Sequence, residues 1–406
     1  MFKLWLSTAA IGIATMTFAQ QNHIDLINPS APEFAQFGQL DIGVRTIEVS
    51  SPDAVDVLNT TRGGETAFYE RRLTVEVWYP ADLAGEEPGG TYDAITRNPQ
   101  ITATLQGRAV RNAKALIGSV PYPLIIISHG YPGNRYLLSH AGENLASKGY
   151  IVASIDHKES TYDDQQSIVS TLYNRPIDQR AVLNSLAALS EEAESPFYSL
   201  IDSENTGIIG YSMGGYGLVN NLGGGFSEQS IGGFISPPNG LLEIHSTVNP
   251  SFREKLDSRI KAGLIVAPWG MNAGFWTESD LAGITVPGFF IAGDQDTVAG
   301  YENGTKKIFQ GAVNSERYLL TYLGAGHNAG APISLPVELD NEENAEPATH
   351  YLDGNWDNVE MNNIMDHFAT IWFDNHLKGV ERSDALNNIP KNYQERLRLE
   401  HLTIGE

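Results

Sequence analysis

Residues 208–215 read Ile-Ile-Gly-Tyr-Ser-Met-Gly-Gly, and this stretch decides how the rest of the chain is interpreted. A short apolar run at 207–209 leads into the pattern Gly-x-Ser-x-Gly at 210–214, and a helical pattern rich in small residues follows at 215–222. A strand that turns sharply into a helix lifts the serine hydroxyl above the edge of a sheet. Glycines flank the serine because such a turn is strained and its backbone segments run close together. The stretch therefore predicts Ser212 as a nucleophile.

The segments around this turn alternate between strand and helix patterns. Continuous apolar runs at 123–128 and 150–155 are typical of strands buried on both faces, and helical spacing is found at 137–148 and 177–189. The further expected elements are two antiparallel strands (44–49 and 73–79), three later strands (262–267, 288–292 and 317–322) and a closing helix (358–377). This alternation predicts an α/β fold with a mostly parallel central sheet and helices on both faces.

Three segments interrupt the alternation. Residues 81–119 are rich in Gly, Pro and Asp, and they predict a loop with a weakly helical segment. Residues 223–258 and 328–356 contain turns, prolines and acidic residues, and we expect them to be insertions over the active-site edge. Because no repeat or low-complexity linker separates these parts, residues 20–406 are predicted to form a single domain.

Composition excludes several classes of function. Residues 1–19 have a positive start, an apolar stretch and a small-residue cleavage site, which predict a signal peptide and a secreted or periplasmic protein. No other stretch is long and apolar enough to suggest a stable membrane anchor. The chain has 49 acidic and 26 basic residues, a net charge of −23, which argues against binding to nucleic acid or to anionic membranes. With no cysteine, disulfides, a thiolate nucleophile and cysteine-bound metals are excluded.

An acid and a base follow Ser212 at the ends of later strands. Asp294 and Asp296 come just after the run 289–292, and His327 follows the strand expected at 317–322. The order Ser, acid, His is that of the α/β-hydrolase triad, in which the imidazole removes the serine proton and the carboxylate orients the imidazole. We favour Asp296 over Asp294 because Asp296 begins a turn, whereas Asp294 lies close to the strand. His157, His350 and His367 are the rival bases, at less convincing positions.

Two backbone N–H groups are expected to hold the oxyanion of the reaction. One belongs to Met213, the residue after the nucleophile, and the other lies in the loop after an earlier strand. That loop reads His-Gly-Tyr-Pro-Gly at 129–133. Since proline has no N–H, Tyr131 is the expected donor. Trp269 follows another strand, and an aromatic ring at this edge is a candidate for lining the substrate pocket.

These motifs resemble those of exported bacterial α/β hydrolases related to platelet-activating-factor acetylhydrolase and the predicted dienelactone hydrolases. The resemblance extends from about residue 44 to residue 379. It is carried by the elbow at 210–215 and by the stretches at 123–130, 145–152, 175–180 and 373–379. Because no cysteine is present, the thiolate chemistry of true dienelactone hydrolases is excluded.

The chain is also similar to bacterial cutinase-like polyesterases. The shared features are the pair Ser212-Met213, the pair Pro268-Trp269 and the stretch Asp-Thr-Val-Ala at 296–299. The resemblance implies that Asp296 is the triad acid, that Met213 and Tyr131 supply the oxyanion N–H groups, and that Trp269 lines the substrate cleft. The chain departs from that family in its His-Gly-Tyr loop and in its larger insertions, which put an open polymer-binding groove in doubt.

Together, these features predict a serine carboxylic-ester hydrolase that works through a Ser-His-Asp triad and an acyl-enzyme intermediate. The expected partner is a small-molecule or polymeric ester, and neither a metal nor a cofactor is required. The alternatives are a polyesterase and a catalytically silent α/β-hydrolase module used for binding. The sequence leaves the acyl group, the alcohol and the oligomeric state open.

Overall fold

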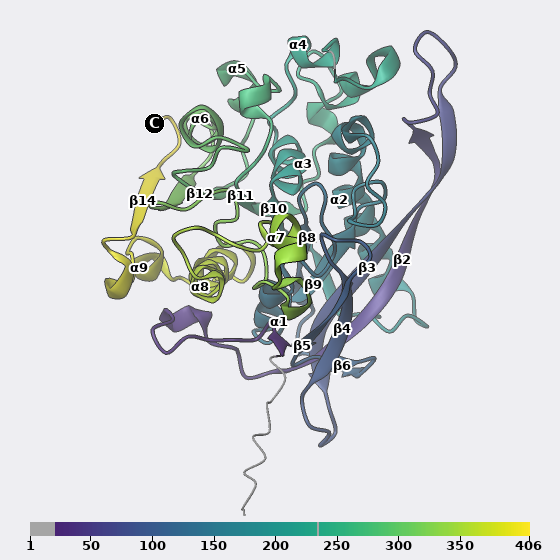
Figure 1. Ribbon diagram of the computed structural model, residues 1–406. Helices are drawn as coiled ribbons and strands as arrows, with labels where there is room; N and C mark the ends of the chain where they lie inside the picture. The colour runs from purple at the N-terminus through teal and green to yellow at the C-terminus, as the bar shows by residue number, and fades with distance from the viewer. Residues whose placement is uncertain (1–20, 234) are drawn as a thin grey trace, which may run out of the picture.

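An eleven-stranded sheet runs through the part of the chain that the computed structural model describes, residues 21–233 and 235–406 (Figure 1). The predicted signal peptide at 1–19 lies outside the described residues. In spatial order the strands are β14 (Leu397–Leu402), β13 (Arg317–Tyr322), β12 (Gly288–Gly293), β11 (Ile260–Val266), β10 (Ile201–Tyr211), β8 (Tyr122–Ser128), β9 (Ile151–Asp156), β3 (Ala67–Asp82), β2 (Asp41–Asp56) and β6 (Val110–Arg111), with β7 (Lys114–Ala115) beside β3.

The centre of this sheet is parallel. Strands β9, β8, β10, β11, β12 and β13 pair with one another in parallel. The long strands β2 and β3 form an antiparallel pair at one side, and β14 runs antiparallel to β13 at the other. Parallel strands direct their carboxyl ends to one edge of the sheet, where ligands bind in open α/β folds. The mostly parallel sheet expected from the sequence is thus the architecture found.

Helices cover both faces of the sheet (Figure 1). On one face α1 (Ser139–Ala146) and α8 (Asn358–Leu377) pack into one hydrophobic core, and on the other α2 (Ile168–Glu191), α3 (Met213–Asn221) and α6 (Lys306–Gly311) pack into a second. The shorter helices are α4 (Glu228–Ile231), α5 (Glu278–Leu281), α7 (Ala345–Ala348) and α9 (Ser383–Leu386). No helix in the described ranges is both long enough and apolar enough to cross a bilayer.

The burial of β8 shows why the continuous apolar runs form central strands. Residues 124–127 are fully buried, and their side chains alternate between the two cores. Leu124 and Ile126 belong to one core, and Ile125 and Ile127 to the other. A strand with helices on both faces has no polar face, so its sequence is apolar at every position.

The prediction of a weakly helical segment within 81–119 is wrong, because the structure has strands there. This region contains β4 (Gly90–Ile95) and β5 (Thr102–Gly107), which pair with β1 (Asn22–His23) in a separate three-stranded sheet. Inward-facing Tyr92, Ala94, Ala103 and Leu105 alternate with exposed or half-buried residues. This two-residue period is the signature of a strand, but the surrounding Gly, Pro and Asp residues mask it.

Candidate active site

Ser212 lies on the sharp turn between β10 and α3. Its backbone has φ 52° and ψ −111°, outside the regions that a serine ordinarily occupies. The turn is held by the Ser212 N–H, which donates to the Val266 carbonyl at 2.9 Å, and by the Ser212 carbonyl, which accepts from the N–H groups of Tyr216 and Trp269. These bonds to β11 and α3 fix a strained conformation that presents the hydroxyl at the carboxyl end of the sheet.

Two glycines of the motif are required by close backbone contacts. A Cβ on Gly210 would lie 2.5 Å from the Gly214 carbonyl oxygen, and a Cβ on Gly214 would collide with the backbone of Ser128. Any side chain at either position would push α3 away from β8 or from β10. The Gly-x-Ser-x-Gly spacing therefore follows from how tightly the turn is packed.

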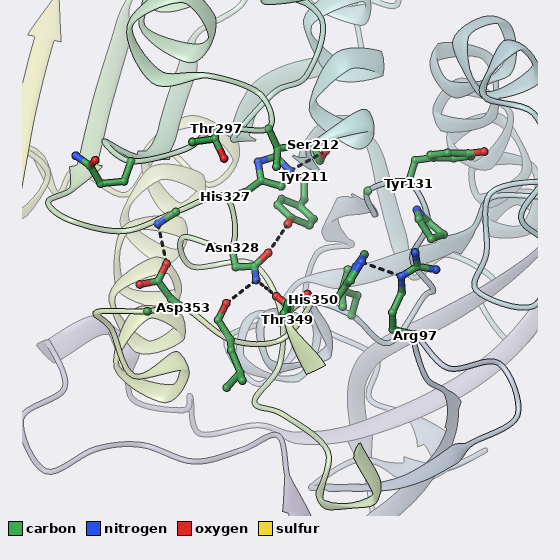
Figure 2. Close-up of a pocket in the computed structure, with 18 of the residues that line it drawn as sticks. Arg97, Tyr131, Tyr211, Ser212, Thr297, His327, Asn328, Thr349, His350 and Asp353 are labelled. Atoms are coloured by element: carbon green, nitrogen blue, oxygen red, sulfur yellow. Dashed lines mark hydrogen bonds between the residues drawn. The ribbon is translucent and has the colours of Figure 1, made fainter. Parts of the chain in front are cut away.

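The structure brings Ser212, His327 and Asp296 into one hydrogen-bonded series, called the open series below. His327 Nε2 lies 3.0 Å from Ser212 Oγ, and His327 Nδ1 lies 2.8 Å from Asp296 Oδ2. Asp296 follows β12 and His327 follows β13. The parallel strands therefore bring Ser212 and His327 together although they are 115 positions apart in the sequence. Figure 2 shows the His327 and Ser212 side chains pointing toward each other, with the hydrogen bond between them dashed.

The geometry distinguishes the two candidate acids. Burial opposes ionisation of Asp296, but the hydrogen bond from His327 and the N–H groups of Val298 and Ala299 outweigh it and lower the pKa of Asp296. Asp294 instead accepts from the Gly324 N–H at 2.7 Å and does not contact His327. Asp294 thus holds the loop that carries His327, which leaves Asp296 as the carboxylate able to orient the imidazole.

The loop that carries His327 is fixed by neighbouring polar groups. Asp353 accepts from the Gly326 N–H at 2.7 Å (Figure 2). The Tyr211 ring packs against the imidazole with ring centroids 5.3 Å apart, and its hydroxyl donates to Asn328. Because these contacts act on both sides of the histidine, the imidazole is positioned before any substrate binds.

The two expected oxyanion donors lie beside Ser212. Among the described residues neither the Tyr131 N–H nor the Met213 N–H donates to another protein group. The carbonyl of Gly130 accepts from buried Arg175 and from His129 Nδ1. A trans peptide directs its carbonyl and its N–H to opposite sides, so the Tyr131 N–H points away from Arg175. Met213 begins α3, where N–H groups lack partners within the helix.

Ser212 opens into a cavity of about 690 Å³. Ser212, His327 and Tyr131 all line it, together with Arg97 and His350 (Figure 2). Residues of the segment 328–356 form much of the lining, whereas none of the described residues of 223–258 does. Segment 328–356 thus reaches the cavity, and the described residues of 223–258 do not.

Trp269 does not line this cavity. It is half-buried, and its ring packs with Phe275 and Tyr216 at centroid distances of 5.6 and 6.3 Å. Its backbone N–H supports the elbow through the Ser212 carbonyl. The structure thus brings together the predicted triad and oxyanion residues but leaves the predicted cleft tryptophan in an aromatic cluster beside them.

Two charged residues of the site have no recognisable sequence motif. Asp353 lies in a stretch without a recognisable motif, and Arg97 lies between β4 and β5 in the segment that was expected to be a loop. Nothing in their local sequence separates them from other surface charges. In the described part of the chain, no cluster of three or more His, Asp or Glu side chains is arranged to hold a metal ion.

A second Ser-His-Asp series lies behind the elbow. Ser128 Oγ is 2.8 Å from His157 Nε2, and His157 Nδ1 is 2.9 Å from Asp178 Oδ2. The three residues, called the sealed series below, are at most 1% exposed. Burial, together with the positive charge of Arg175, lowers the pKa of His157 to about 3. The rival base His157 is therefore a neutral, buried histidine.

The sealed series connects β3 to the elbow. Asp178 accepts two hydrogen bonds from buried Arg71, which lowers the pKa of Asp178 despite its burial. At the other end, Gln179 Nε2 donates both to Ser128 Oγ and to the Gly214 carbonyl. The network thus provides hydrogen-bond partners for the buried polar groups next to the loop 129–133, and through Gln179 it links Ser128 to Gly214 of α3.

The other two rival histidines also have local partners. His350 Nε2 accepts from Arg97 Nε at 2.8 Å in the cavity wall. His367 lies in α8, and its Nδ1 accepts from the Phe34 N–H. Neither forms a hydrogen bond with Ser212, whereas His327 does.

The chain is similar to several known hydrolases. A family model described as PET hydrolase-like matches residues 116–224, the region from β8 through the elbow helix. Cutinase 1 of Thermobifida cellulosilytica is 27% identical over 209 residues, which cover 51% of this chain and 61% of the cutinase. The platelet-activating-factor acetylhydrolase of Cavia porcellus is 25% identical over 247 residues, which cover 54% of this chain and 53% of that enzyme.

The chain resembles the cutinases and the platelet-activating-factor acetylhydrolases. It spans about half to three-fifths of the length of these curated relatives. A solved structure of a ferulic acid esterase from Streptomyces cinnamoneus matches 90% of this chain and 97% of its own, with a TM-score of 0.59 at 18% identity. That likeness, together with the sheet order and the elbow, shows an α/β-hydrolase fold.

Proposed function

We propose that the protein is a serine carboxylic-ester hydrolase. The observation that carries the proposal is the open series, in which a strained serine, a histidine and a buried carboxylate are hydrogen-bonded in order at the wall of a cavity. The relatives named cutinase, acetylhydrolase and ferulic acid esterase support the same reaction class.

The proposed reaction begins when Ser212 Oγ attacks the ester carbonyl. His327 Nε2 takes the hydroxyl proton as the C–O bond forms, and Asp296 stabilises the resulting imidazolium at Nδ1. The N–H groups of Tyr131 and Met213 bind the oxyanion. When the tetrahedral intermediate collapses, the alcohol leaves with the proton from His327, and the acyl group stays on Ser212.

Deacylation reverses these roles with water in place of the alcohol. His327 removes a proton from water, the hydroxide attacks the acyl carbonyl, and the carboxylic acid leaves as the proton returns to Ser212 Oγ. In this proposal each proton passes through His327 Nε2, which lies 3.0 Å from Ser212 Oγ. The proposed cycle requires neither a metal nor a cofactor.

The test is hydrolysis of para-nitrophenyl esters of increasing acyl length, with Ser212→Ala as the baseline. The proposal predicts initial rates well above that baseline and a clear optimum of chain length. Rates no higher than those of the variant across the series, combined with no labelling by a fluorophosphonate, would instead indicate a binding module.

A polyesterase is the second candidate, because the matching family model is described as PET hydrolase-like. Residues of segment 328–356 line part of the cavity into which a polymer chain would have to reach. Release of soluble monomers from a polyester film by the wild-type protein, and not by Ser212→Ala, would establish this activity. Hydrolysis of soluble esters without any release from the film would restrict the substrate to small molecules.

A further inference from the structure

Arg97 places a positive charge in the wall of the cavity that holds Ser212 (Figure 2). Its Nε donates to His350 Nε2 at 2.8 Å, and its Nη1 donates to Gln165 Oε1 at 3.4 Å. Both acceptors are uncharged: burial and the neighbouring Arg97 charge lower the pKa of His350 to about 4. The guanidinium is thus oriented by its partners but is not neutralised by them.

Most of the other arginines in the described residues have a carboxylate partner, whereas Arg97 lines the cavity without one. Nine other arginines in the described residues form ion pairs with Asp or Glu, in a chain that has 49 acidic residues for 26 basic ones. Within the same described ranges no carboxylate oxygen lies within 4 Å of the Arg97 guanidinium. A cation left unpaired in such an acidic protein is available to an anion from outside.

The carboxylate of Asp353 in the cavity wall does not pair with the Arg97 guanidinium. Asp353 also lines the cavity, but its two carboxylate oxygens accept from the backbone N–H groups of Gly326, Asn355 and Trp356. Figure 2 shows Asp353 on the His327 side and Arg97 on the opposite side. An elongated ligand could therefore place an ester at Ser212 and an anion at Arg97 while avoiding Asp353.

The wall that carries Arg97 is rigidly supported. The Arg97 N–H donates to the Tyr351 hydroxyl at 3.1 Å, and the Tyr162 ring packs against both Tyr351 and His350. Asn98, the next residue, donates to Asn344. These contacts join the β4–β5 connection to the segment 328–356, so little side-chain freedom is lost when an anion binds.

We infer that Arg97 is a carboxylate-binding residue and that the preferred substrates are esters that carry a free carboxylate, such as monoesters of dicarboxylic acids. The guanidinium presents planar N–H donors that match the two oxygens of a carboxylate. This inference rests on the proposed esterase function and adds a charge preference to it. In Figure 2 Arg97 lies apart from Ser212 and His327, so it acts on substrate choice rather than on the bond-breaking steps.

Two matched substrate pairs test the inference. On the acyl side, mono-para-nitrophenyl adipate is compared with para-nitrophenyl hexanoate. On the alcohol side, 4-acetoxybenzoate is compared with its methyl ester. For at least one pair, Arg97→Gln should lower kcat/KM for the anionic ester by about 10- to 100-fold, the range of a charge-assisted hydrogen bond, and change the neutral ester less than about threefold.

Two further variants serve as controls. Arg97→Lys keeps the charge but not the planar donors, and it should restore part of the preference. Arg108→Gln removes the same charge from an exposed arginine paired with Asp25, outside this cavity, and should leave both members of each pair unchanged. Equal effects of Arg97→Gln on the anionic and neutral esters of both pairs would overturn the inference. Absence of hydrolysis of any ester by the wild type would instead refute the proposed function.

Discussion

The open and sealed series have the same three side-chain types and nearly the same distances, yet they lie in opposite environments. The Ser-to-His distance is 3.0 Å in the open series and 2.8 Å in the sealed series, and the His-to-Asp distances are 2.8 and 2.9 Å. Ser212 lines a cavity of about 690 Å³, whereas Ser128 is completely buried. Hydrogen-bond geometry alone therefore does not identify a catalytic serine.

Backbone conformation separates the two serines further. Ser212 has a positive φ on a turn into a helix, so unpaired N–H groups lie next to its hydroxyl. Ser128 is the last residue of β8, and its hydroxyl also accepts from Gln179. The first arrangement leaves room for a carbonyl group and its developing charge, and the second leaves none. Access and a site for the oxyanion distinguish a nucleophile from a structural hydroxyl.

The largest expected difference is in the response of activity to loss of each serine. Ser212→Ala should reduce kcat by about 10⁵- to 10⁶-fold, because both the nucleophile and the covalent route are lost. Ser128→Ala should keep kcat/KM within about tenfold of wild type and lower the free energy of unfolding by about 1 to 3 kcal/mol, since buried donors lose a partner. Initial rates on a para-nitrophenyl ester and urea unfolding measure the two effects.

The second difference concerns the acid of the open series. Asp296→Asn should lower kcat by about 10⁴-fold, because an amide cannot stabilise the imidazolium and favours the wrong tautomer of His327. Asp294→Asn is the matched control: its amide oxygen can still accept from the Gly324 N–H, so activity should fall less than about tenfold. A larger loss in Asp294→Asn than in Asp296→Asn would reverse the assignment of the acid.

The third difference concerns stability rather than catalysis. Asp178→Asn should lower the free energy of unfolding by about 3 kcal/mol, because it leaves the buried charge of Arg71 without its main partner. Glu70→Gln breaks the exposed pair with Arg72 on the same strand, and it should lower the free energy of unfolding far less, because solvent screens an exposed pair. Equal losses of stability in the two variants, measured by urea unfolding, would show that the sealed series does not support the fold.

The smallest expected effect is on the pH dependence of stability. The folded pKa of His157 is about 3 against an ordinary value of 6.5, so between these pH values the unfolded chain binds a proton that the folded chain does not. Its contribution to stability is thus lost as pH falls below about 6.5.

His157→Gln should abolish this difference in proton binding between the folded and unfolded chains, because glutamine does not titrate. The slope of unfolding free energy against pH between 4 and 6 should become shallower by up to about 1.4 kcal/mol per pH unit. Urea unfolding at several pH values provides the slope for the wild type and the variant. An unchanged slope would mean that His157 titrates alike in the folded and unfolded chains.

The sequence predicted the parts of the molecule whose patterns are local. Residues 317–322 and 358–377 are the observed bounds of β13 and α8. The helix expected at 177–189 begins earlier, at Ile168, because Pro176 lies inside α2 and mimics a helix boundary. Strand β14 was missed although its residues 397, 399 and 402 are apolar.

For the site, motif order placed Ser212 and His327 at the ends of their strands, and the turn favoured Asp296. Arg97 and Asp353 could not be predicted, since each reaches the cavity only through tertiary packing of a segment without regular pattern. The sealed series was equally hidden: Ser128, His157 and Asp178 belong to β8, the β9 loop and α2, and only the sheet order brings them together.

The central claim is that Ser212, and not Ser128, is the reactive serine. The most direct measurement is labelling of the wild-type protein with a fluorophosphonate, followed by proteolysis and mass spectrometry of the modified peptide. The account predicts one adduct per chain on the peptide containing Ser212, and none in Ser212→Ala. An adduct on the peptide containing Ser128, or labelling that persists in Ser212→Ala, would contradict it.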